Sequence, residues 1–257
     1  MTDGTFFTTL YPRHPFAGLI AEDFPEDQQS FFYDPEVFAD LVRRTRPQLI
    51  IEVGTWKGHS ANAMADICKS EKLGTKIICV DTWLGSQEHY LLEQWRPTLH
   101  IEHGRPKVWE RFIGNTIRRS NHDCIFPLAL PAATASVVLS EMGVKANLIY
   151  IDAGHEYDDV LSDISNYFPL LEPDGIMFGD DFHHPPLARA VHEFAASARR
   201  GVARKGGKWI YLRDEGELGG LAGYEIVLMN GRSIIPSRLR LALRRFLARK
   251  EPNHATV

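Results

Sequence analysis

The sequence of 257 residues has few cysteines, no long apolar run and no large excess of charge of one sign. The three cysteines lack metal-ligand spacing, and we expect reduced, buried thiols in a cytoplasmic protein. No apolar stretch approaches the roughly 18 residues needed to span a membrane, and the first residues lack the layout of a signal peptide. A net charge of -4 gives no reason to expect nucleic acid as a partner.

Two common nucleotide-binding motifs are also missing. The loop EVGTWKG at 52–58 is neither the GxGxxG dinucleotide fingerprint nor a P-loop. An acid at the end of the preceding strand fits a diphosphate poorly, because like charges repel. It suits a ligand with a cationic centre or an amino-acid moiety. This pattern argues against an NAD-dependent oxidoreductase, which we keep as an alternative.

A strand, a glycine loop, a helix and a second strand make up the first half of a predicted nucleotide-binding sheet. The apolar run at 48–53 ends beside Glu52, and the run at 76–80 ends in Asp81. We expect Asp81 to accept hydrogen bonds from two ribose hydroxyls and Trp83 to offer a flat face to an adenine. Taken together, these features indicate S-adenosylmethionine, which has a sulfonium, an amino-acid end and an adenosine.

The segment NLIYIDAGHEYDDVLSDISNYFPLLEPDGIMFGDDF at 147–182 contains two buried strands that each end in acids. The carboxyl ends of parallel strands share one sheet edge, so Asp152, His155, Asp180 and Asp181 are expected to converge. Three such carboxylates repel one another unless a cation or protons neutralise them, and Mg²⁺ prefers oxygen ligands. A histidine can take a proton near neutral pH. The alternative, that an aspartate caps the next segment and His155 is a loop histidine, stays open.

These two blocks carry a family resemblance. The run EVGTWKGHS at 52–60 resembles the first motif of class I methyltransferases, in the form found in catechol-type O-methyltransferases. The segment at 147–182 is similar to the macrocin O-methyltransferase and cephalosporin-hydroxylase-like branch of that superfamily. The resemblance covers roughly residues 34–230.

The resemblance implies roles for individual residues. The residues that it implies for S-adenosylmethionine binding are Glu52, Gly54, Gly58, Ser60 and Asp81. Our predicted cofactor site also includes Thr55, Thr82 and Trp83. The implied ligands of Mg²⁺ are Asp152, Asp180 and Asp181. His155 stands where catechol enzymes have a lysine as general base. Because of this departure, Asp152 remains an alternative base.

The predicted fold is α/β, with a doubly wound, Rossmann-like, seven-stranded and mostly parallel sheet whose last strand is antiparallel. We divide the chain into an N-terminal extension (1–33), a methyltransferase domain (34–232) with an insertion over the active site (84–120), and a basic C-terminal helix and tail (233–257). The extension is expected to pack as a surface strap rather than as a lid. The basic helix at 237–250 is expected to dock by its leucines rather than to bind a membrane or RNA.

The predicted activity is metal-assisted methyl transfer from S-adenosylmethionine to the hydroxyl of a small molecule, such as a sugar or other secondary metabolite. Three alternatives remain: a cofactor-binding partner subunit without chemistry of its own, an NAD-dependent oxidoreductase and an RNA methyltransferase. The sequence does not name the acceptor, and homo-oligomerisation stays open.

Overall fold

The computed structural model describes residues 5–27, 29–30, 34–219, 222–229 and 232–233. The predicted basic helix at 237–250 lies outside them. The strands form one sheet in the order β3-β2-β1-β4-β5-β7-β6-β8-β9. They are β1 (Leu49–Val53), β2 (Lys76–Asp81), β3 (Ile125–Ala129), β4 (Ala146–Ile151), β5 (Leu171–Gly179), β6 (Gly201–Lys205), β7 (Lys208–Leu212), β8 (Glu225–Met229) and β9 (Arg232–Ser233).

Strands β1 to β5 are parallel, whereas β7 runs antiparallel to both of its neighbours, β5 and β6. The prediction of a doubly wound, mostly parallel sheet is confirmed. The strand number of seven and the single antiparallel strand are wrong, because β8 and β9 add two further antiparallel pairings. Strand β6 was not predicted, because its sequence GVARK contains no apolar run; it forms a hairpin with β7 through Gly206 and Gly207.

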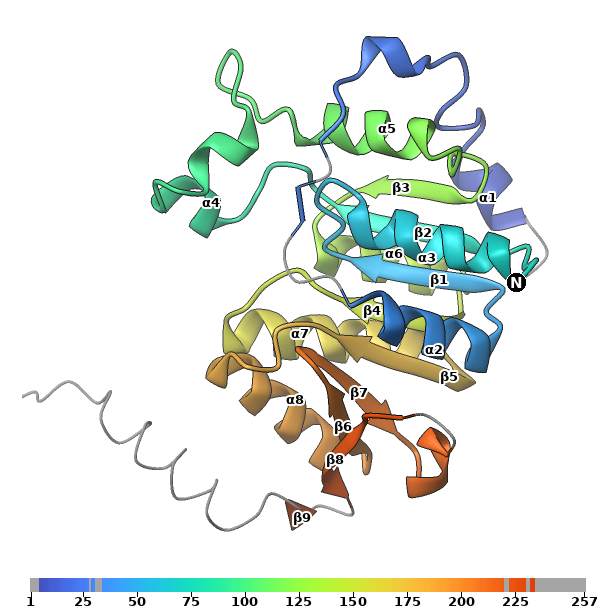
Figure 1. The fold of residues 1–257 in the computed structure, drawn as a ribbon, viewed down its shortest axis with the longest axis vertical. Coiled ribbons are helices and arrows are strands. Elements are labelled where there is room, and N and C mark those ends of the chain that lie inside the picture. The colour runs from blue at the N-terminus through green and yellow to red at the C-terminus, as the bar shows by residue number, and fades with distance from the viewer. Residues whose placement is uncertain (1–4, 28, 31–33, 220–221, 230–231, 234–257) are drawn as a thin grey trace, which may run out of the picture.

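Helices cover both faces of the sheet (Figure 1). The α-helices are α1 (Thr5–Leu10), α2 (Pro35–Thr45), α3 (His59–Ser70), α4 (Gln87–Leu91), α5 (Val108–Arg118), α6 (Ala132–Glu141), α7 (Tyr157–Tyr167) and α8 (Pro185–Ser197). The short 3-10 turns are η1 (Ala21–Asp23), η2 (Arg96–Leu99), η3 (Phe168–Leu170) and η4 (Glu215–Leu218). One core cluster joins the sheet to α2, α3 and α5, and the other joins it to α6, α7 and α8.

Burial of the central strands on both faces explains their continuous apolar sequences. In β1, Ile50 packs in the first cluster and its neighbour Ile51 in the second, and both are fully buried. Ile77 and Ile78 of β2 divide in the same way. Polar side chains are therefore confined to the strand ends, where the helices leave one edge of the sheet uncovered.

Two local features differ from the predictions. The expected turn at 172–175 belongs to β5, where its pairing with β4 shifts register between Ala146 and Leu148. Pro185 and Pro186 do not hold the chain extended but begin α8. A proline is tolerated there because the first amides of a helix have no partner within it.

The N-terminal segment packs on the sheet near β3 and on α5. Phe16 is buried in the first core cluster, and the Tyr11 hydroxyl donates to the carbonyl of Pro127 at 2.9 Å.

In Figure 1, α4 lies beyond the carboxyl ends of β1 and β3. A search of the described residues for a helix long and apolar enough to span a membrane found none.

Candidate active site

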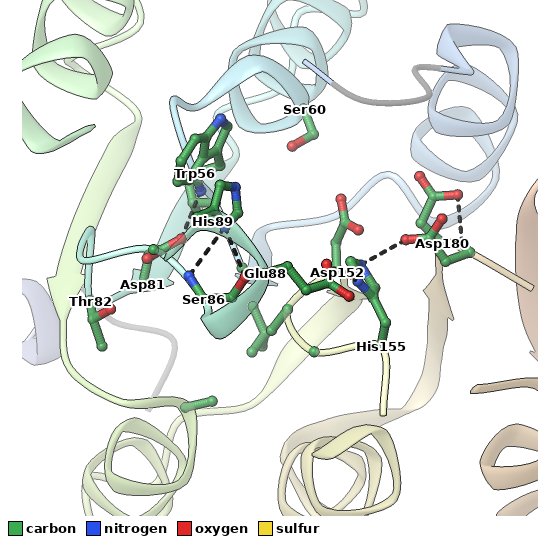
Figure 2. A pocket seen from close by; sticks show the side chains of 18 of the residues that line it. Trp56, Ser60, Asp81, Thr82, Ser86, Glu88, His89, Asp152, His155 and Asp180 are labelled. Carbon is green, nitrogen blue, oxygen red and sulfur yellow. Dashed lines mark hydrogen bonds and ion pairs between the residues drawn. The ribbon is translucent and has the colours of Figure 1, made fainter. Parts of the chain in front are cut away.

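A cavity of about 560 Å³ lies at the carboxyl ends of the parallel strands. Its walls come from the segments that follow β1, β2, β3, β4 and β5, together with α4 and residues 29–30. Figure 2 shows Trp56, Asp81 and His89 on one side and Asp152 with His155 on the other. The volume is typical of sites for small organic molecules.

Glu52 lies beneath the loop after β1 and holds two hydroxyl groups. It is fully buried, and it accepts hydrogen bonds from Ser60 Oγ and, at 3.0 Å, from Thr55 Oγ1. Burial raises the pKa of Glu52 to about 7, although the hydrogen bonds oppose this shift. Thr55 and Ser60 line the cavity, whereas Glu52 does not, so Glu52 acts through the two hydroxyls.

Gly54 brings this loop against the strand end that follows β4. Its φ is +88°, and an added Cβ would lie 2.1 Å from the carbonyl oxygen of Asp152. A side chain at this position would therefore separate the two halves of the cavity wall.

Asp81 terminates β2 and fixes the backbone around it. Its Oδ2 accepts from the Trp56 amide and its Oδ1 from the Trp83 amide, both at 2.7 Å. Burial raises the pKa of Asp81 even though these amide bonds oppose the shift. Asp81 and Thr82 both line the cavity, where a carboxylate can also accept from ligand hydroxyls.

An aromatic pair closes this side of the cavity. The Trp56 ring stacks on His89 of α4, with ring centroids 4.2 Å apart and an interplanar angle of 26°. His89 is itself held by Ser86, whose Oγ lies 2.8 Å from His89 Nδ1. Trp56 has a φ of +52°, a left-handed conformation that costs of order 1–3 kcal/mol in a residue other than glycine.

A buried polar cluster lies on the opposite side. The Tyr150 hydroxyl lies 2.8 Å from Asp152 Oδ2 and 3.3 Å from Asp180 Oδ2. Lys208 Nζ donates to Asp180 Oδ2 and lies 3.2 Å from the Tyr150 hydroxyl. Burial, and then the charge of Asp180, raise the pKa of Asp152 well above its usual range. Burial also raises the pKa of Asp180, while Lys208 opposes that shift.

His155 lies between two carboxylates. Its Nε2 is 2.9 Å from Asp181 Oδ2 and its Nδ1 is 3.4 Å from Glu88 Oε2. The hydrogen bond to Asp181 raises the pKa of His155 to about 9, against the effect of burial. Burial alone would raise the pKa of Asp181, but the bond from His155 and the nearby histidines hold it below its usual range. The imidazole is therefore protonated at neutral pH.

A second ion pair, in which only the lysine is fully buried, ties the glycine loop to the N-terminal segment. Lys57, whose side chain is only 1% exposed, donates to Asp27 Oδ2 at 2.6 Å and to Gln29 Oε1 at 2.9 Å. His100 Nε2 lies 3.0 Å from the same Asp27 oxygen. The side chain of Asn115 in α5 accepts a hydrogen bond from the Asp27 amide and donates one to the Asp27 carbonyl. Asp27 thus joins the N-terminal segment, the glycine loop and residues 84–120.

Comparison with known proteins identifies the family. A family model described as a methyltransferase domain matches residues 51–182, just over half of the chain. The chain belongs to this methyltransferase family. The match begins in β1 and ends two residues after Asp180, so it contains both halves of the cavity wall described above.

Solved structures support the methyltransferase fold. An O-methyltransferase from Bacillus cereus in complex with SAH is 15% identical with a TM-score of 0.51, covering 75% of this chain and 86% of that one. TomG, an O-methyltransferase from Streptomyces achromogenes in complex with SAM, is 14% identical with a TM-score of 0.52, covering 81% and 94%. The SAH-bound methyltransferase PaMTH1 from Podospora anserina is 16% identical with a TM-score of 0.52, covering 74% and 81%.

A relative in sequence is the uncharacterized protein y4gI of Sinorhizobium fredii, which is 25% identical over 142 residues. The match covers 55% of this methyltransferase but spans only 14% of the length of that relative.

Most of the predicted site residues meet at the cavity. Those that line it are Gly54, Thr55, Ser60, Asp81, Thr82, Asp152, His155, Asp180 and Asp181. Glu52 and Gly58 lie behind the wall; an added Cβ on Gly58 would lie 2.7 Å from the Phe112 ring.

Two predictions need correction. Trp83 cannot offer a face to a ligand in this cavity, because its side chain is only 2% exposed and packs against Trp109 and Phe112. The three predicted carboxylates line the cavity but do not form one ligand group: the groups found among the described residues join Asp181 to histidines, and Asp180 pairs with Lys208.

Sequence reasoning missed Lys208, Tyr150, Trp56 and His89. Trp56 lies inside the first motif, so its place in the loop was a usable signal. The sequence contained no such signal for Lys208, because Lys208 lies beside Asp180 only through the antiparallel pairing of β7 with β5.

Proposed function

We propose that this methyltransferase transfers a methyl group from S-adenosylmethionine to the hydroxyl of a small-molecule acceptor. One observation carries the proposal: a single cavity joins the glycine loop and Asp81 to the pair formed by His155 and Asp181. The first half offers hydroxyl and carboxylate acceptors for the polar groups of a nucleoside and an amino acid. The second half offers groups that bind and deprotonate a hydroxyl.

S-adenosylmethionine supplies an electrophilic methyl group on a sulfonium; the acceptor oxygen bonds to its carbon while the carbon–sulfur electron pair returns to sulfur. Thr55 and Ser60, held by Glu52, are proposed to bind the amino-acid end. Asp81 is proposed to accept from the ribose hydroxyls, and the pair of Trp56 and His89 to exclude water.

Asp152 is proposed to take the acceptor's proton. Both ring nitrogens of His155 face carboxylates, which accept hydrogen bonds and do not donate them. The ring therefore has no nitrogen left to receive a proton, and we assign it to orienting the acceptor oxygen. Asp152 lines the cavity, so its carboxylate is available to an acceptor bound there.

The cluster does not fit the magnesium site expected from the sequence. Asp180 is held by Lys208, and the groups near Asp152 and Asp181 include an imidazole, whereas Mg²⁺ prefers oxygen ligands. No step of the proposed reaction is therefore assigned to Mg²⁺.

The motifs in the segment 147–182 support a place in the macrocin O-methyltransferase and cephalosporin-hydroxylase-like branch, and hence a sugar or other secondary metabolite as acceptor.

The test is transfer of labelled methyl from S-adenosylmethionine by the purified chain to a panel of hydroxylated sugars and phenols. Transfer is expected with the native chain, and Asp152→Asn should reduce the rate by at least about 100-fold, as expected for loss of a general base. His155→Gln should reduce the transfer rate less than Asp152→Asn does, because His155 is assigned to orienting the acceptor oxygen. Absence of transfer to every acceptor would favour the partner-subunit alternative. A greater loss in His155→Gln than in Asp152→Asn would move the base to His155.

A further inference from the structure

The two carboxylate oxygens of Asp181 face different groups. Oδ2 lies 2.9 Å from His155 Nε2. Oδ1 lies 3.8 Å from His183 Nε2 and 3.9 Å from His184 Nε2. The bond to His155 thus uses one oxygen, while the other is directed towards two imidazoles that the proposed methyl transfer does not use.

The backbone holds these three side chains in one tight turn. Asp181 has a left-handed φ of +59°, and its carbonyl accepts from the His184 amide at 2.8 Å. The Phe182 amide donates to the Gly207 carbonyl at 2.8 Å, which fixes the turn to the hairpin of β6 and β7. Pro185 then begins α8. The turn is therefore constrained on both sides before any ligand binds.

We propose that Asp181, His183 and His184 form a binding site for a transition-metal ion. Their ligand atoms all lie within 4.8 Å of one another. Two ligands that each lie about 2.1 Å from a shared ion are roughly 3–4 Å apart, so the separations from Asp181 need only small side-chain movements. Two imidazoles with one carboxylate suit iron, cobalt, nickel or zinc, whereas Mg²⁺ and Ca²⁺ require oxygen ligands.

The exposure of the two rings fits a site that keeps open positions. The side chains of His183 and His184 are 51% and 47% exposed, while that of Asp181 is 13% exposed. Asp181 and His184 also line the cavity. An ion bound here would lie at the cavity wall with positions left for water or for an oxygen ligand from solution.

A second group of potential ligands, Asp152, His155 and Asp181, also lies within 4.8 Å. We favour the histidine pair because an ion at the second group would have to break the hydrogen bond between His155 and Asp181. It would also compete with the Tyr150 hydroxyl for Asp152. An ion on Asp181 Oδ1 leaves both of these contacts in place. The inference concerns metal binding and does not depend on methyl transfer.

The test uses the full chain, stripped with EDTA and desalted, and titrated with Co²⁺ by calorimetry and visible absorption in buffer containing millimolar Mg²⁺. We expect one Co²⁺ per chain and no competition by Mg²⁺. His183→Ala with His184→Ala should weaken binding by at least about 100-fold, because loss of outer-shell partners alone typically costs 10–100-fold. His122→Ala, which removes an exposed histidine after α5, should bind as the native chain does.

Asp152→Asn decides between the two groups, because it should leave Co²⁺ affinity within about threefold of native under our assignment. Loss of binding in Asp152→Asn but not in the double histidine variant would overturn the assignment. Equal affinity of the double variant and the native chain, or displacement of Co²⁺ by Mg²⁺, would also overturn it. The two rings are about half exposed, so the double variant should melt near the native temperature; His183→Asn with His184→Asn is the substitute if it does not.

Discussion

Lys208 provides the most demanding test of the polar cluster beneath the cavity. Its side chain is fully buried and that of Asp180 is 4% exposed, so the charges of this pair are shielded from water. Lys208→Met removes the cation but keeps a chain of similar length against the rings of Phe38 and Tyr150. The carboxylate of Asp180 is then left buried without its ion partner, which typically costs about 3–5 kcal/mol.

Lys205 offers a matched control on the neighbouring strand. It pairs with Asp40 at 3.0 Å, but the two side chains are 21% and 24% exposed. Because solvent screens this pair, Lys205→Met should lower the free energy of unfolding by no more than about 1 kcal/mol. The comparison isolates burial of the ion pair from loss of a lysine.

The assay is equilibrium unfolding in urea, followed by circular dichroism, for Lys208→Met, Lys205→Met and the double variant Lys208→Met with Asp180→Asn. The double variant should regain at least about 1 kcal/mol relative to Lys208→Met, since contacting residues couple by about 0.5–3 kcal/mol. A loss in Lys208→Met no larger than that in Lys205→Met would refute the reasoning. So would a double variant less stable than Lys208→Met alone.

Three further predictions follow from the other half of the cavity. Gly54→Ala should lower stability by roughly 1–3 kcal/mol and abolish binding of S-adenosylhomocysteine, because its Cβ meets the backbone of Asp152; thermal melting and calorimetry measure both. The pKa of Glu52 is about 7 in the folded state against 4.5 in the unfolded state, so the free energy of unfolding should fall by roughly 1.4 kcal/mol per pH unit as the pH rises between these values. Glu52→Gln should remove this slope in urea titrations from pH 5 to 8. Asp27→Ala should leave the buried Lys57 without its ion partner and weaken S-adenosylhomocysteine binding at least about tenfold, whereas an unchanged affinity and melting temperature would contradict the proposed link to the glycine loop.

The central part of the fold could be predicted because local sequence and tertiary environment agree there. Strands β1, β2 and β4 are apolar on both faces, and the acids at their ends mark the uncovered sheet edge. The convergence of Asp152, His155 and Asp181 followed from parallel strand direction alone. These features depend on the strand order of the sheet and not on side-chain geometry.

The incorrect predictions depend on side-chain direction and on antiparallel pairing. Trp56 and Trp83 both follow strand ends and both have left-handed φ values, yet only Trp56 lines the cavity. The direction in which each ring points is set by its neighbours, which the sequence does not place. A lysine at the start of a strand, such as Lys208, is usually solvated, and the sequence does not indicate that β7 lies beside β5.

The cofactor of this methyltransferase can be tested directly by a calorimetric titration of the purified chain with S-adenosylhomocysteine and, separately, with NAD. We expect one S-adenosylhomocysteine per chain and no binding of NAD. Asp81→Ala should bind S-adenosylhomocysteine at least about tenfold more weakly, because it loses the proposed contact to the ribose hydroxyls. Binding of NAD without binding of S-adenosylhomocysteine would contradict this expectation.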